Sequence, residues 1–184
     1  MAKSNGRPLS YSRRVPTSAK DAIALLKADH RQVEQLFAEF EKARDKKRKA
    51  KLADQICKAL KIHTQLEEEI FYPEFLEATD YEEIYHEAKV EHESAKRLIA
   101  ELEADPSDEY FDARMAVLSN IVEHHVNEEE KLDGMFIKAR RAGMDLDEIG
   151  ERLQARRSEL EADLTWLGKA KKLSTSAGTS SDVR

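Results

Sequence analysis

Apolar residues recur at steps of three and four along five stretches of the chain, which is the spacing of one face of an α-helix. These stretches run from Ile23 to Phe40, Leu52 to Ile70, Tyr85 to Leu102, Phe111 to Phe136 and Leu146 to Leu167. No stretch shows the period-two alternation of a half-buried strand. The pattern predicts an all-α protein: an up-down-up-down antiparallel four-helix bundle with an additional C-terminal helix.

Capping and breaking residues set the expected helix ends. Thr17 or Ser18 can cap the first helix with a side-chain oxygen. The second helix should span about 48–77, with Pro73 kinking it or marking its last regular turns. Asp80 should cap the third helix.

The same signals divide the chain into four parts. Residues 1–15 and 171–184 are polar and aperiodic, and we expect both ends to be disordered. The bundle should occupy residues 16–142 and be ended by Gly143. An amphipathic helix over residues 145–169 should follow and pack against the bundle or against a second subunit.

Polar residues interrupt the apolar stripe of each of the four bundle helices. Histidine and especially glutamate are costly to bury without a partner, so these positions call for one. A shift of 62 residues maps the first three of them onto the last three. The six residues are His30, His63, Glu67, His92, His125 and Glu129.

Three predicted turns bring these six residues to one level. In an antiparallel hairpin, residues equidistant from the turn lie at the same height. The midpoint between His30 and His63 falls at 46–47, and that between His92 and His125 falls at 108–109. The midpoint between Glu67 and His92 falls at 79–80. Each midpoint coincides with a predicted connection. The six side chains should therefore share one internal layer of the bundle.

Four imidazoles and two carboxylates are more than a single zinc ion requires, because zinc usually takes about four ligands. Arranged two-fold, they fit a dinuclear site in which each metal takes two histidines and both glutamates bridge. Mixed nitrogen and oxygen ligation suits iron first and manganese second. Each metal would be left short of six ligands, so solvent, an oxo bridge or a substrate must complete it.

Composition and charge indicate the compartment and the kinds of partner to expect. The single cysteine, Cys57, rules out an internal disulfide, and the basic N-terminus is not a secretory signal. No apolar run approaches the roughly 20 residues of a membrane span. With a net charge of −6, we expect a cytoplasmic protein that binds neither membrane nor nucleic acid. Residues 42–51 hold seven Lys or Arg, which we interpret as a solvated helix connection rather than a docking patch.

Four segments resemble the hemerythrin-like (HHE cation-binding) family of the H-HxxxE-H-HxxxE type. They are LLKADHRQVEQLFAEFE, IHTQLEEEIFYPEF, VEHESAKRLIAELE and EHHVNEEEKL, and they span residues 20–141. The resemblance implies a non-haem di-iron centre with the same six residues as ligands. Its two Fe ions would be bridged by an oxo or hydroxo group and by carboxylates.

Two departures separate the chain from the oxygen-carrying members of that family. Oxygen carriers have a fifth histidine where this chain has Lys96. Their second bridging carboxylate follows its histidine by five residues, whereas Glu129 follows His125 by four. The resemblance therefore favours relatives associated with peroxide breakdown, nitric oxide chemistry, iron sensing or iron–sulfur repair.

Several neighbouring side chains are candidates to complete the site. Tyr72 and Tyr85 lie near the right layers and can orient or ligate, although most tyrosines at such positions only pack. Glu68, Glu91 and Glu130 can accept hydrogen bonds from ligand imidazoles. We expect a position outside the site for three others: His124, which is turned about 100° from His125, His86 and Glu34.

Three functions follow for such a chain. The first is a redox-active di-iron protein that binds or reacts with peroxide, dioxygen or nitric oxide in oxidative or nitrosative stress defence, including catalase-like peroxide decomposition. The second is an iron- or oxygen-sensing or iron-handling protein without turnover. The third is a structural bundle, for which six buried polar residues would make a poor core.

Overall fold

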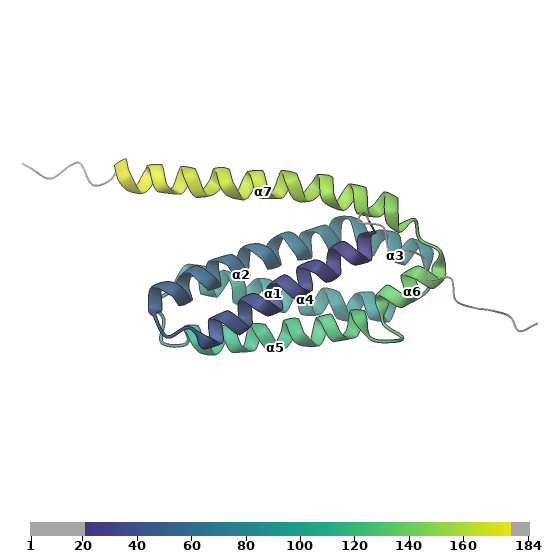
Figure 1. Cartoon of the computed structure of the whole chain (residues 1–184), viewed down its shortest axis with the longest axis horizontal. Coiled ribbons are helices and arrows are strands. Elements are labelled where there is room, and N and C mark those ends of the chain that lie inside the picture. The colour runs from purple at the N-terminus through teal and green to yellow at the C-terminus, as the bar shows by residue number, and fades with distance from the viewer. Residues whose placement is uncertain (1–20, 178–184) are drawn as a thin grey trace, which may run out of the picture.

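The computed structural model describes residues 21–177, with side chains as far as residue 164, and every regular element in this range is helical. Four helices form the predicted antiparallel bundle and a fifth long helix lies along one side (Figure 1). The bundle helices are α1 (Ala22–Lys42), α2 (Lys46–Leu66), α4 (Glu82–Ala104) and α5 (Phe111–Glu130), and the fifth is α7 (Leu146–Ala177). The predicted fold class is confirmed.

Aspartates cap the first two helices. The side chain of Asp21 accepts a hydrogen bond from the backbone N–H of Ala24 at the start of α1. Asp45 does the same for Arg48 at the start of α2. These bonds satisfy donors that the first helical turn leaves free. The caps predicted at positions 17 and 18 lie outside the described residues.

Two predicted boundaries are wrong. Helix α4 begins at Glu82, one residue too late for Asp80 to cap it, and the capping position belongs to Tyr81. The fourth bundle helix does not continue unbroken to Gly143. It stops at Glu130, and α6 (Met135–Ala142) starts after a short turn. Leu132 falls in this turn and is 91% exposed, because the break rotates it off the predicted apolar stripe.

The second helix is continuous but irregular before Pro73. A π-helical turn, η1 (Glu67–Phe71), joins α2 to α3 (Tyr72–Ala78), and the N–H of Tyr72 reaches back five residues to the carbonyl of Glu67. The irregularity is thus a widened turn rather than the sharp kink that a proline often causes. Widened turns of this kind are frequent at functional sites.

Two apolar clusters fill the bundle, one on each side of the predicted polar layer. The first is built around Phe37, Ile56, Met115 and Leu118, and the second around Leu26, Phe71, Phe75 and Met135. Helix α7 adds Ile149, Leu153 and Leu160 to the second cluster, so it packs against the bundle of its own chain. It runs on to Ala177, past the predicted end at residue 169, so the expectation of disorder from residue 171 is wrong for residues 171–177.

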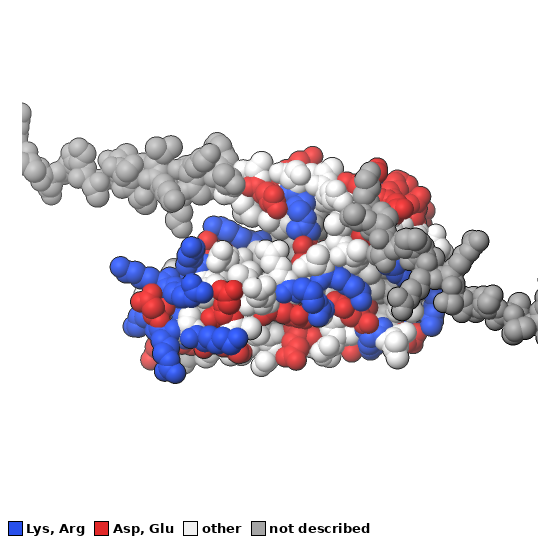
Figure 2. Space-filling model, viewed as in Figure 1, with Lys and Arg blue, Asp and Glu red and all other residues white. Residues whose placement is uncertain are grey.

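Lys and Arg gather where α1 connects to α2, at one end of the molecule (Figure 2). Exposed acidic residues accompany them: Arg48 pairs with Glu39 at 3.0 Å, and Lys49 pairs with Asp112. Part of this basic segment is therefore paired with acidic side chains at the surface. Within residues 21–177, none of the helices combines the length and the apolarity that crossing a membrane requires.

Candidate metal centre

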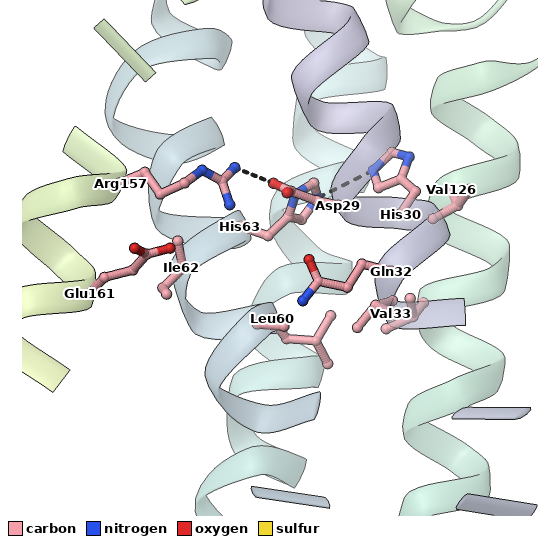
Figure 3. Close-up of a pocket in the computed structure, with 12 residues that line it drawn as sticks. Asp29, His30, Gln32, Val33, Leu60, Ile62, His63, Val126, Arg157 and Glu161 are labelled. Carbon is pink, nitrogen blue, oxygen red and sulfur yellow. Dashed lines mark hydrogen bonds and ion pairs between the residues drawn. The ribbon is translucent and has the colours of Figure 1, made fainter. Parts of the chain in front are cut away.

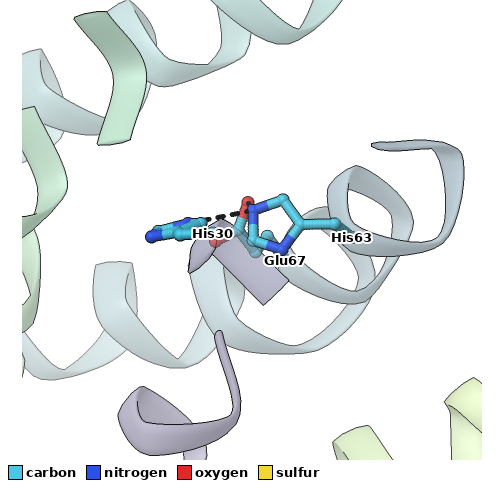
Figure 4. Close-up of side chains that lie close together, drawn as sticks. All are labelled: His30, His63 and Glu67. Atoms are coloured by element: carbon cyan, nitrogen blue, oxygen red, sulfur yellow. Dashed lines mark hydrogen bonds and ion pairs between the residues drawn. The ribbon is translucent and has the colours of Figure 1, made fainter. Parts of the chain in front are cut away.

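The six predicted residues meet in one buried layer between the two apolar clusters. Their side chains come from α1, α2, η1, α4 and α5, and each is at most 6% exposed. Two groups of potential ligand atoms form there, His30, His63 and Glu67 in one, and Glu67, His92 and His125 in the other. Within each group the atoms lie within 4.8 Å of one another, and Figure 4 shows the first group. Glu67 belongs to both.

The imidazoles face each other in pairs. Nε2 of His30 lies 3.2 Å from Nε2 of His63, and Nε2 of His92 lies 3.3 Å from Nε2 of His125. Two ring nitrogens at this distance can share only one proton. A cation between them would instead accept both lone pairs.

A carboxylate stands behind every imidazole. When Nδ1–H donates to such a carboxylate, the tautomer is fixed and the Nε2 lone pair points into the layer. The Nδ1 contacts are Glu130 with His30 at 2.8 Å, Asp29 with His63 at 3.4 Å, Glu68 with His92 at 3.0 Å and Glu91 with His125 at 2.8 Å. All four Nε2 atoms are therefore presented to the interior.

Sequence reasoning identified three of these carboxylates and missed Asp29. The missed residue was nevertheless visible in the repeat, because a shift of 62 residues maps Asp29 onto Glu91 and Glu68 onto Glu130. The repeat thus includes the groups that orient the ligands as well as the ligands themselves.

Two buried carboxylates in the layer keep oxygen atoms without a hydrogen-bond partner. Oε2 of Glu67 lies 3.1 Å from Nε2 of His63 and 3.3 Å from Nε2 of His92, while its Oε1 has no donor. Oε2 of Glu129 is also without a donor. Burying such an oxygen is costly unless a cation balances it. The donor set therefore fits metal ions that prefer mixed nitrogen and oxygen ligation.

The ligands of the layer differ in the direction of their pKa shifts. Burial lowers the pKa of His30 to about 4, which keeps this imidazole neutral. Burial also opposes the cationic form of His63, but the charge of Glu67 and the hydrogen bonds that His63 donates to Asp29 and Glu67 outweigh it and raise the pKa of His63 to about 10. Burial and the charge of Glu67 raise the pKa of Glu129 to about 8. His63 and Glu129 thus hold protons in the metal-free layer, and a bound metal would displace these protons.

Tyr72 points its hydroxyl into the layer. The oxygen lies 3.2 Å from Oε1 of Glu129 and 3.3 Å from both Oε2 of Glu67 and Nε2 of His92. Burial and the charges of the two glutamates raise the pKa of Tyr72 well above its usual value, so the phenol is a neutral donor here. The π-helical turn positions Tyr72, because the turn ends at Phe71, directly before Tyr72 in the chain.

Other residues considered from the sequence lie outside the layer. His124 is 58% exposed and contacts Glu91 on the surface, while Glu34 is an exposed partner of Arg31. The exposed His86 contacts the ring of Tyr85, which in turn packs edge-on against Tyr72. The contacts of these four side chains therefore lie away from the six predicted ligands.

Lys96 takes a different role from the histidine that oxygen carriers have at this position. Its Nζ donates to Glu68 at 2.7 Å, and Glu68 accepts from His92. Lys96 therefore braces a carboxylate that orients an imidazole. Burial opposes ionisation of Glu68, but hydrogen bonds from His92, Lys96 and Lys89 together outweigh it and hold the pKa of Glu68 well below its usual value.

Fold and site together define a helical-bundle protein with a buried histidine and carboxylate cation site. A family model described as the hemerythrin HHE cation binding domain matches residues 21–136. The chain therefore belongs to the hemerythrin HHE cation-binding family.

Two similar proteins were found. A crystal structure of a hemerythrin HHE cation binding domain-containing protein from Mycobacterium kansasii superposes with a TM-score of 0.65 at 24% identity, covering 79% of this chain and 90% of that one. It has the same fold. A DNA nickase of Nostoc sp. is 34% identical over 110 residues, or 58% of this chain. The chain spans only 30% of the length of that curated relative.

Proposed function

We propose that this chain holds two iron ions in the buried layer and binds or reacts with a small oxidant: peroxide, dioxygen or nitric oxide. The observation that carries the proposal is the convergence of four inward-facing Nε2 atoms with two buried carboxylate oxygens that accept no hydrogen bond. The ligands would be His30, His63, Glu67, His92, His125 and Glu129. Manganese is the second choice for the same donor set.

Two metals are favoured over one because the six residues divide into two imidazole pairs with Glu67 between them. Glu129 lies opposite, with Oε2 3.4 Å from Nε2 of His30 and 3.7 Å from Nε2 of His125. These contacts support a role for both carboxylates as ligands shared by the two metals. Bound iron would polarise a small ligand and exchange electrons with it.

The protein around the site would orient the ligand imidazoles, exclude bulk water and provide a hydrogen-bond donor. The carboxylates behind the imidazoles hold the rings in one tautomer. The ring of Phe136 stacks on His30 at 5.8 Å, and the two apolar clusters exclude bulk water. The hydroxyl of Tyr72 touches both glutamates, which suits it to donate a hydrogen bond to a small ligand. Such chemistry would serve oxidative or nitrosative stress defence in the cytoplasm.

The alternative is an iron- or oxygen-sensing protein without turnover. It is supported by the contact from α7 to the site: Arg157 donates to Asp29, and Asp29 contacts His63. Through this contact, metal occupancy could stabilise the packing of a surface helix.

Metal analysis and peroxide assays separate these functions. The protein should be expressed with excess iron, assayed for iron per chain, examined for oxo-bridge absorption bands, and then mixed with peroxide while oxygen release is followed. We expect about two irons per chain and oxygen release. Two irons without peroxide turnover would favour sensing or gas binding. Less than one metal per chain would overturn the di-iron proposal.

Ligand variants provide the matched control. His63→Ala and Glu129→Ala should each abolish dinuclear loading, because each removes a donor that no neighbour replaces. His124→Ala, next to a predicted ligand but 58% exposed, should load normally.

A further inference from the structure

A cavity of about 90 Å³ lies directly against two of the predicted ligands. The side chains of His30 and His63 form part of its wall, between α1, α2 and α5, and α7 covers the opposite side (Figure 3). The rest of the wall is largely apolar, built from Val33, Ala59, Leu60, Ile62, Val122 and Val126. The cavity thus joins the metal layer to the face under α7.

The size and lining of the cavity select what can enter it. A water molecule occupies roughly 30 Å³ in the liquid, so the cavity holds about three small molecules of that size. Peroxide, dioxygen and nitric oxide fit, whereas an organic substrate does not. Apolar walls suit weakly hydrated molecules in particular.

Polar side chains stand on the side toward solvent. Exposed Gln32 and Glu161 line the cavity there, together with half-buried Arg157 of α7. The guanidinium of Arg157 reaches across from α7 to Asp29 on α1, with 2.5 Å between the nitrogen and Oδ2. Figure 3 shows this ion pair on the side of the cavity opposite His30 and Val126. A partly exposed ion pair of this kind can open without unfolding the helices.

We infer that this cavity is the access site through which a small, weakly hydrated oxidant reaches the His30–His63 half of the centre, and that Arg157 of α7 gates its mouth. The inference rests on the proposed function, because it names the route to the same site. It also gives α7 a role that the bundle alone does not require.

Xenon tests the cavity independently of iron. Xenon is apolar, small enough for this space and detectable in crystals under pressure whether or not metal is bound. The unmodified protein should bind one xenon atom beside Ala59 and Val126. Ala59→Phe should remove that site, because the new ring fills the cavity, and Ala38→Phe on the exposed face of α1 should not. A cavity that takes up no xenon would overturn the inference.

Nitric oxide tests the gate. Its binding rate to the reduced, iron-loaded protein should fall about tenfold in Ala59→Phe and rise at least about threefold in Arg157→Ala. Arg156→Ala is the matched control, because Arg156 pairs with Glu69 and Glu159 and does not line the cavity. Unchanged rates in both test variants, with iron still bound, would overturn the access route and leave the proposed function standing. Failure to load iron would instead overturn the proposed function.

Discussion

The carboxylate of Asp29 on α1 lies 3.4 Å from Nδ1 of His63 on α2, and the same relationship recurs 62 residues later. There, Glu91 on α4 lies 2.8 Å from Nδ1 of His125 on α5. In each hairpin the residue before the first histidine orients the second. Because the orienting group and the imidazole sit on different helices, the contact also fixes how the two helices are placed.

Removing the Asp29 carboxylate should weaken metal binding more than it weakens the fold. Asp29→Ala leaves His63 without its Nδ1 partner, and loss of such a partner typically lowers metal affinity about 10- to 100-fold. Competition with a chelator would measure the affinity. Asp54→Ala, an exposed aspartate on α2 paired with Lys58, is the control and should bind metal normally. Equal affinities in the two variants would show that Asp29 does not orient a ligand.

Tyr72 should matter for reaction rather than for metal loading. Tyr72→Phe keeps the packed ring and removes the hydroxyl that contacts Glu67 and Glu129. Loss of a positioned proton donor commonly costs about 100-fold in rate, so peroxide turnover should fall to that extent with two irons still bound. Tyr85→Phe removes a hydroxyl from the neighbouring ring and should leave turnover unchanged. A variant of Tyr72 with full activity would exclude the phenol from the chemistry.

The two halves of the repeat differ five residues after their glutamates. The 62-residue shift carries Tyr72 onto Gly134, so only the first half provides a phenol at this position. A Cβ at Gly134 would lie 2.4 Å from the carbonyl oxygen of Glu128 and 2.6 Å from that of Glu129. Glycine is needed here because the chain passes so close to the backbone of a predicted ligand.

Replacing that glycine should therefore disturb the centre. Gly134→Ala must push the backbone of Glu129 aside, with a cost of about 1–3 kcal/mol in unfolding free energy and a loss of metal affinity. Gly143→Ala is the control: its left-handed φ of +77° also penalises a side chain, but nothing lies within 4 Å of the new atom. It should lose about 1 kcal/mol and load metal normally. Calorimetry with metal analysis would measure both quantities.

The six-residue layer could be predicted because it depends on periodicity and on turn positions, which the sequence contains. His63 and Glu67 share a helix face at any bundle geometry. Asp29 was missed because it directly precedes His30 and is therefore turned about 100° around the helix from it. At that position it looks solvated until the neighbouring helix is in place. The break at Leu132 and the π-helical turn depend on how the chain packs around the glutamates, and local residue preferences carry little information about that.

Metal loading should stabilise the protein more as pH rises from 7 to 8.5. In the metal-free protein the pKa of His63 is raised to about 10 and that of Glu129 to about 8. The unfolded chain has already lost these protons above about pH 6.5, so the stability they provide is lost as pH rises toward the folded values. Bound metal replaces the protons and removes this loss. The difference in Tm between loaded and metal-free protein should therefore widen by roughly 5 °C, measured by differential scanning calorimetry. A difference that narrows with pH would contradict the proton-for-metal exchange in this layer.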